Sequence, residues 1–263
     1  MNFSIFIASF IQITLLSFLL LSGVSCALYT PDSGKNQVIT TCNVPTDQSG
    51  TVSGHWQVTP IPMAFHQNDF QSNEISSMIN AVSTWNNFFT ASKNIKTLDG
   101  STTDNPRLST ATNPAQSGPI CDHGLVQGKS FSGNVVIYKL GQWPSAYPAS
   151  AIALTSFCSI SSQPYPAIYM ALMEINYQNF FIEGQKNPDL ESIVLHELGH
   201  LHGLNHSCEV TNKTGTPNCK DPNIDPSYLS ASMYPSFSFD TAGMGEQRRS
   251  LGSNDESRAN CLY

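Results

Sequence analysis

An eleven-residue segment, residues 196–206, constrains this chain more than any other, and it reads HELGHLHGLNH. His196 and His200 are four residues apart, so on a helix they stand one turn above each other on the same face. At this spacing two imidazole nitrogens can reach one zinc ion at about 2.0–2.1 Å. Glu197 lies at the edge of the same face, beside the metal position. The segment therefore predicts a helix that carries two metal ligands and an adjacent carboxylate.

The end of this helix is predicted to supply a third ligand. Gly203 can adopt the left-handed conformation that ends a helix and turns the chain sharply, which brings His206 round to the metal. Three protein ligands leave a fourth position for water, an arrangement typical of catalytic rather than structural zinc. His202 lies about 240° round the helix from His196, so we expect it to face away from the metal. The alternative is a helix with incidental surface histidines, but the whole pattern would arise by chance in only about one in 100,000 such chains.

Two segments have the apolar spacing of amphipathic helices. The first carries a stripe about four turns long that we expect to pack in the core, formed by Ile75, Met78, Ile79, Val82, Trp85 and Phe89. The second contains the histidines, and Asp189 is well placed to cap its start. Its buried side is predicted to consist of Ile193, Val194, Leu195, Leu198 and Leu201. A capping box at Ser253–Glu256 predicts a short final helix that runs to Tyr263.

Several apolar runs between turn signals predict strands. These runs are Trp56–His66, Asn134–Leu140, Ala151–Phe157 and Ala167–Tyr177. Residues 99–120 are rich in Ser, Thr, Asn and Pro, which predicts an irregular surface loop. Residues 28–55 are polar with scattered Pro and Gly, and we expect them to form an extended N-terminal segment.

The first 27 residues have the pattern of a secretory signal peptide. They contain no charged side chain, are almost continuously apolar from Phe3 to Leu21, and end in small residues that suit a cut after Ala27. The alternative is a lipid anchor at Cys26, because Gly23–Cys26 resembles the lipobox of bacterial lipoproteins. Both interpretations predict export. No second stretch of about 18 apolar residues follows, so we expect no membrane span in the mature chain.

The charge balance excludes some classes of partner. The chain has 12 Lys and Arg against 19 Asp and Glu, a net charge of −7, and its charged fraction of 12% is about half the usual value. Binding to nucleic acid needs clustered basic residues, and binding to an anionic membrane surface needs them too. We therefore expect neither partner.

The seven cysteines predict disulfides. Cys26 falls at the edge of the leader, which leaves an even number in an exported chain and predicts three bridges. The pairing Cys208–Cys219 closes a short loop and is favoured. The other expected pairs are Cys121–Cys158 and Cys42–Cys261.

The zinc segment resembles the signature of the metzincin zinc metalloproteases, H-E-x-x-H-x-x-G-x-x-H, a group that also has a downstream Met-turn. Met233, in the segment SASMYP, lies 27 residues after His206 and is the candidate for that turn. Ser207 after the third His and the order Met-Tyr-Pro are similar to the matrixin branch. The resemblance covers residues 56–263. It implies an α+β domain with a twisted, mostly parallel five-stranded sheet, two backing helices, and a small C-terminal subdomain with a third helix.

The resemblance also implies roles for individual residues. His196, His200 and His206 would bind one catalytic zinc, Glu197 would be the general base, and Met233 would form the apolar floor beneath the metal. The wall of the pocket that accepts a substrate side chain would be Pro235, Ser236 and Phe237. Asp122-His123 is too little for the ligand set of a second, structural zinc, and the sequence does not support a structural calcium ion either.

The residues after Cys42 are similar to the latency segment of matrixins, in which a free thiolate occupies the fourth zinc position. Because a free Cys42 would leave one other cysteine unpaired, the disulfide is the favoured interpretation.

The function implied is that of a secreted zinc endopeptidase that acts as a monomer on protein or peptide substrates. A zinc-bound water, activated by Glu197, would attack the peptide bond. We expect the substrate to lie extended along an exposed sheet edge, formed by the strand that ends near Asn176. The alternative is a non-catalytic zinc-binding surface or adhesion module on the same fold.

Overall fold

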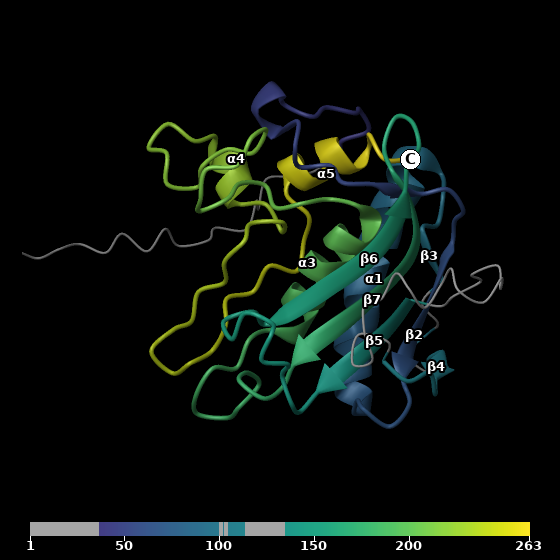
Figure 1. Cartoon of the computed structure of the whole chain (residues 1–263), viewed down its shortest axis with the longest axis vertical. Coiled ribbons are helices and arrows are strands. Elements are labelled where there is room, and N and C mark those ends of the chain that lie inside the picture. The colour runs from purple at the N-terminus through teal and green to yellow at the C-terminus, as the bar shows by residue number, and fades with distance from the viewer. Residues whose placement is uncertain (1–36, 100–101, 103–104, 114–134) are drawn as a thin grey trace, which may run out of the picture.

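The computed structural model of the chain describes residues 37–99, 102, 105–113 and 135–263. The predicted leader with Cys26, the segment Asp122-His123 and Cys121 lie outside the described residues. The described part combines one mixed sheet with helices packed against it and short helices towards the C-terminal end (Figure 1). The α+β class expected from the sequence is confirmed.

The sheet is mostly parallel. Five strands follow each other in the order β1-β7-β5-β2-β3, while β4 pairs with β2 and β6 pairs with β7. Every pairing is parallel except that of β6 with β7. The strands are β1 (His55–Trp56), β2 (Ile61–His66), β3 (Leu98–Asp99), β4 (Leu108–Ser109), β5 (Val135–Leu140), β6 (Ala153–Ile160) and β7 (Ala167–Asn176).

The single strand predicted over Trp56–His66 is wrong, because the structure has two strands there. β1 pairs with the start of β7, whereas β2 pairs with β5, so the chain changes partner between them. Pro60 lies in this connection and has no N–H to donate to a ladder, which interrupts the strand. Val58 beside it is 76% exposed.

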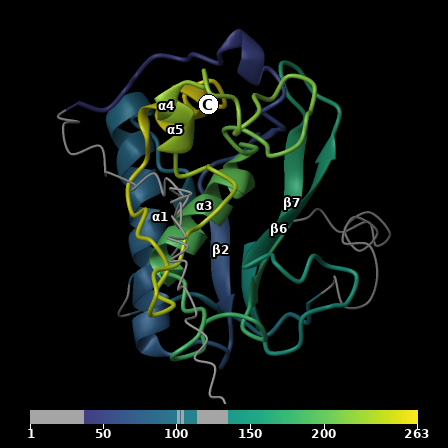
Figure 2. The same ribbon diagram turned by 90° about the vertical axis from the view of Figure 1, so that its left-hand side faces the viewer.

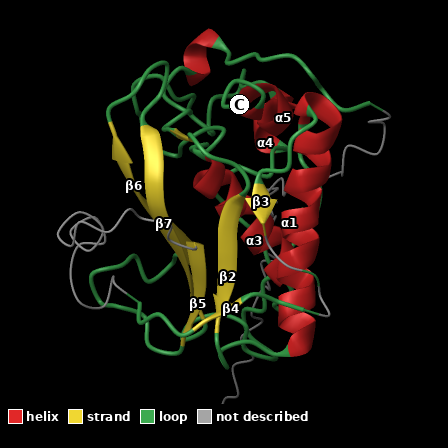
Figure 3. Cartoon of the chain, turned by 90° about the vertical axis from the view of Figure 1, so that its right-hand side faces the viewer, coloured by secondary structure: helices red, strands yellow, loops and turns green. Residues whose placement is uncertain are grey.

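Two long helices cover one side of the sheet (Figure 3). α1 (Ser72–Lys93) begins with a capping box in which the Gln71 N–H donates to Glu74 Oε2 at 2.7 Å. Its predicted stripe is confirmed from Met78 to Phe89, all of it buried. α3 (Leu190–His202) begins where predicted, since the Asp189 carboxylate accepts the Ser192 N–H at 3.0 Å. Its apolar side packs into the same core as α1, where Trp85 Nε1 donates to the Leu195 carbonyl at 3.0 Å.

The C-terminal part contains α4 (Pro226–Leu229), which the sequence analysis did not predict, and α5 (Ser253–Ala259). Only half of the predicted capping box forms at α5, and one residue earlier than predicted, because the N-cap glycine has no side chain. Its N-cap is Gly252, whose N–H donates to Asp255 Oδ2 at 2.8 Å, while Glu256 instead accepts the Ile39 N–H. The carboxylate at 255 thus takes the role assigned to that at 256.

The described part of the N-terminal segment packs on the C-terminal subdomain (Figure 2). It contains a short 3-10 helix at Thr46–Gln48. Gln48 and Thr51 are fully buried: Gln48 Nε2 donates to the Ser207 carbonyl at 2.7 Å, and the Thr51 carbonyl accepts the Asn205 N–H at 2.8 Å. The domain limit at residue 56 remains a prediction.

Disulfides tie these segments together. Cys42 is bonded to Cys261 and Cys208 to Cys219, as predicted. Cys158 is also in a disulfide, and its predicted partner Cys121 lies outside the described residues. Because Cys42 is bonded to the end of the chain, the latency interpretation of its segment is wrong. Among the described residues, no helix is long and apolar enough to cross a membrane.

Candidate metal centre

Three histidines converge where α3 ends. His196 and His200 lie one turn apart on α3, and Gly203 ends the helix with φ +105°, as predicted. The Gly203 backbone lies against the Gly54 carbonyl, where a Cβ atom would be only 1.9 Å from the oxygen. The turn brings His206 back to the helix, and one ring nitrogen of each histidine lies within 4.8 Å of the others. This grouping makes the three histidines a candidate site for one metal ion.

Each of these rings is held through its Nδ1 atom. His196 Nδ1 lies 2.7 Å from the Ser232 carbonyl oxygen, and His200 Nδ1 lies 2.7 Å from that of Leu204. His206 Nδ1 lies 3.1 Å from a carboxylate oxygen of Glu209. Because these oxygens can only accept, Nδ1 carries the proton and Nε2 keeps its lone pair. A neutral imidazole held in this way is the form that binds metals.

Burial favours the neutral imidazole in all three residues. Desolvation lowers the pKa of His200 to about 3 and that of His206 to about 4. It also lowers the pKa of His196 well below its usual value, and the neighbouring His200 and His206 add to the effect. The site therefore presents three uncharged nitrogen donors.

Glu197 lies beside the three rings and is held by the sheet. It is buried, and its Oε2 accepts a hydrogen bond of 2.8 Å from the hydroxyl of Thr155 on β6. Burial raises the pKa of Glu197 to about 7, against the opposing effect of Thr155. A carboxyl group with such a pKa can both accept and release a proton near neutral pH.

Met233 packs against α3. It is fully buried, and its side chain lies against Gly199, between the two helical ligands in sequence. A Cβ atom at residue 199 would lie 2.1 Å from Met233 Sδ, so only glycine allows this approach. The Met233 and Ser232 N–H groups donate to Asp255 at 3.1 and 2.6 Å.

A cleft of about 660 Å³ lies over the site. The predicted wall residues Pro235, Ser236 and Phe237 line it, and the Phe237 ring meets that of His196 edge-on with centroids 5.8 Å apart. The remaining lining includes Ala153, Leu154, Thr155 and Phe157 of β6.

The edge strand predicted for a substrate is wrong. Asn176 belongs to β7, which pairs with β5 on one side and β6 on the other. In the described part of the chain β6 pairs only with β7, so its other side forms the edge next to the cleft. Residue spacing could not show which strand forms the edge. β6 lies outside β7 because the two strands pair antiparallel, and spacing does not encode that pairing.

The residues that support the three histidine rings had no signal in the sequence, with one exception. Thr155, Ser232 and Asp255 come from three distant segments, and nothing in their spacing links them to the histidines. Glu209 had a local signal, since it follows His206 by three residues in a turn.

Three neutral imidazoles suit zinc, and a site with three protein ligands leaves one coordination position open. The geometry thus supports a site for one metal ion. No protein-family model and no curated protein matches this sequence.

Proposed function

We propose that this protein is a zinc-dependent endopeptidase of the metzincin type, similar to the matrixins. The observation that carries the proposal is the grouping of three imidazoles, each anchored through Nδ1, with a buried carboxyl group on the floor of a cleft. His196, His200 and His206 would hold the ion. Zinc, when bound there, would act as a Lewis acid that makes water more acidic and stabilises developing negative charge.

Glu197 is the proposed general base. Its position beside the ligands lets it accept a proton from the attacking water and return it to the leaving amine. Thr155 donates to Glu197 Oε2 and so fixes the direction of the carboxyl group. A purely structural site has no use for an acid–base group, which is why we favour catalysis over a zinc-binding adhesion module.

The open edge of β6 is the proposed binding surface for substrate. An extended peptide can add a strand there through backbone hydrogen bonds, independent of its sequence. Pro235, Ser236 and Phe237 face the same cleft, so they would form the wall of the pocket for one substrate side chain. Met233 would support the ligands from below.

The disulfides support the proposal that the protein acts outside the cell. Disulfides persist in oxidising environments such as the cell exterior, where a signal peptide at residues 1–27 would deliver the chain. We propose that the mature chain acts there as a monomer on protein or peptide substrates.

The substitution Glu197→Gln tests the proposal. We expect the variant to bind one zinc ion per chain, as the wild type does, while cleavage of casein falls about 100- to 10,000-fold. Glu183→Gln, in an exposed loop, is the matched control and should cleave normally. A chelator should abolish wild-type cleavage, and added zinc should restore it.

Two results would contradict the proposal. Normal turnover by Glu197→Gln would remove the general base, and a wild type that binds zinc but cleaves neither casein nor a peptide library would favour the adhesion module.

A further inference from the structure

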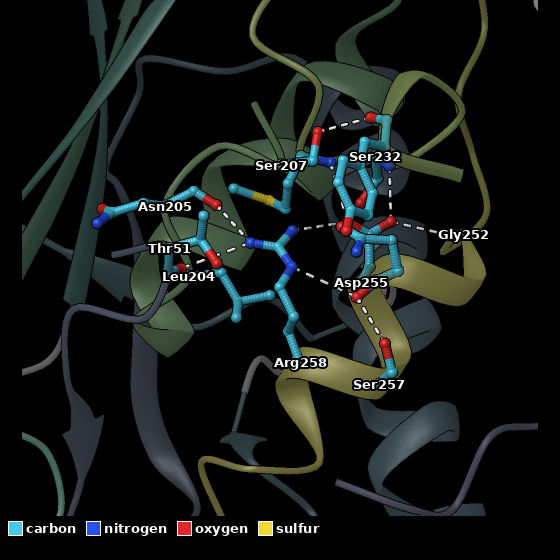
Figure 4. A network of polar contacts seen from close by, with 12 residues as sticks. Thr51, Leu204, Asn205, Ser207, Ser232, Gly252, Asp255, Ser257 and Arg258 are labelled. Carbon is cyan, nitrogen blue, oxygen red and sulfur yellow. Dashed lines mark hydrogen bonds and ion pairs between the residues drawn. The ribbon is translucent and has the colours of Figure 1, made fainter. Parts of the chain in front are cut away.

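Below the metal centre, α5 carries a fully buried arginine. Arg258 Nη1 donates to the Asn205 carbonyl at 3.0 Å and to the Thr51 carbonyl at 3.4 Å (Figure 4). Its Nη2 lies 3.6 Å from Asp255 Oδ1, one turn earlier on the same helix. Burial lowers the pKa of Arg258 to about 10, so the side chain remains a cation at neutral pH.

The partner carboxylate contacts a different segment. Asp255 accepts the N–H groups of Ser232 and Met233 as well as that of Gly252 at its own N-cap. The ion pair therefore joins two loops that are distant in sequence: residues 204–207 on the arginine side and 232–233 on the carboxylate side (Figure 4).

These two loops carry the groups that orient the proposed ligands. The Leu204 carbonyl holds the His200 ring, and the Ser232 carbonyl holds the His196 ring. His206 itself stands between two fixed neighbours, since the Asn205 carbonyl accepts from Arg258 and the Ser207 N–H donates to the Met233 carbonyl at 2.9 Å.

A buried ion pair is not explained by stability alone. Desolvation of both charges costs about as much as their attraction returns, and apolar residues of similar volume often stabilise a core equally well. A guanidinium, however, offers several donors in a fixed fork, so one side chain can fix two carbonyls and a carboxylate at once. Lysine could keep the charge but not this geometry.

We propose that Arg258, with Asp255, is a positioning residue that sets the geometry of the three-histidine site by holding the backbone on both sides of it. This inference rests on the proposed zinc site. Arg258 touches neither the cleft nor the ligand side chains, so it acts through the Asn205 carbonyl and the loops described above.

The test is the zinc affinity of the full mature chain, measured by competition with a chelator, for wild type, Arg258→Met and Arg258→Lys. Interactions that orient the metal ligands typically change metal affinity by about 10- to 100-fold when they are removed. We expect a loss in that range for Arg258→Met. Arg258→Lys should lose less, because it keeps the charge that balances Asp255. The Co²⁺-substituted protein should show the same order as changes in its visible spectrum.

Asn260→Ala is the matched control. Asn260 is also a buried polar residue at the end of α5, but its side chain donates to the Ile39 carbonyl in the N-terminal segment. It should lower thermal stability and leave the zinc affinity within about 3-fold of wild type, well below the 10- to 100-fold effect of ligand support.

The outcomes separate the two proposals. If Arg258→Met folds and binds zinc as tightly as the wild type, or if Asn260→Ala loses as much affinity, the positioning role is wrong. Should Arg258→Met fail to fold, Arg258→Lys decides, and unchanged affinity and spectrum in that variant refute the role. A wild type that binds no zinc would refute the proposed function, and this inference with it.

Discussion

The histidines on the two faces of α3 have different environments. His196 and His200 face the cleft and meet His206, whereas His202 lies on the opposite face, within the core. The His202 ring packs against Trp85 and Phe89, with centroids 4.8 and 5.1 Å away. His202 lies away from the three converging histidines, as predicted.

The two groups of histidines differ in one property that bears on metal binding. Burial lowers the pKa of His202 to about 4, much as it lowers that of His206, so the pKa does not separate the two faces. The hydrogen bonds of the ring nitrogens do separate them. His202 uses both nitrogens, with Nδ1 2.6 Å from the Leu198 carbonyl and Nε2 2.9 Å from the Thr97 hydroxyl. In the three converging rings, only Nδ1 has a hydrogen-bond partner among the described residues.

The largest difference between the faces should appear when one substitution is placed on each. We expect His200→Leu to weaken zinc binding by more than about 100-fold, since it removes a ligand and not only the support of one. Equilibrium dialysis followed by metal analysis measures this. Retention of one tightly bound zinc ion by His200→Leu would end the distinction between the faces.

The substitution His202→Leu, on the opposite face, should lower the free energy of unfolding and leave zinc binding unchanged. His202→Leu removes the ring that contacts the buried Thr97 hydroxyl and the Leu198 carbonyl, and we expect the lost hydrogen bonding to cost about 1–3 kcal/mol in total. Urea denaturation measures the free energy of unfolding, and zinc stoichiometry should remain one per chain. A loss of zinc in a folded His202→Leu protein would show that the two faces are not independent.

The smallest effect on zinc affinity is expected from a substitution at Glu209. This residue distinguishes His206 from the other two converging histidines. His206 is the one ligand whose Nδ1 contacts a side chain instead of a backbone carbonyl. We expect Glu209→Ala to weaken zinc binding by about 10-fold, at the lower end of such effects because the carboxylate is partly exposed. Glu209→Gln keeps an acceptor oxygen and should lose less. Equal affinity of Glu209→Ala and wild type in chelator competition would show that the Nδ1 contact is dispensable.

Local patterns in the sequence predicted the helices well. The stripe of α1 and the Asp189 cap of α3 were confirmed because a 3.6-residue period and a capping carboxylate act over a few residues. Three predicted strands correspond to β5, β6 and β7, but strand pairing was predicted less well, since pairing partners are distant in sequence. The run from Trp56 to His66 has a continuous β pattern, yet it divides between two partners, and the edge at β6 follows from an antiparallel pairing that no local signal encodes.

The sequence alone determined that His196, His200 and His206 meet, because helical spacing and a glycine turn act within eleven residues. Only the tertiary structure decided what holds them. Thr155, Ser232, Asp255 and Arg258 come from a strand, a loop and the final helix, and packing of the whole chain brings them below and beside the site. Residue spacing determines local geometry, whereas the contacts that orient a side chain depend on which distant segments pack together in the core.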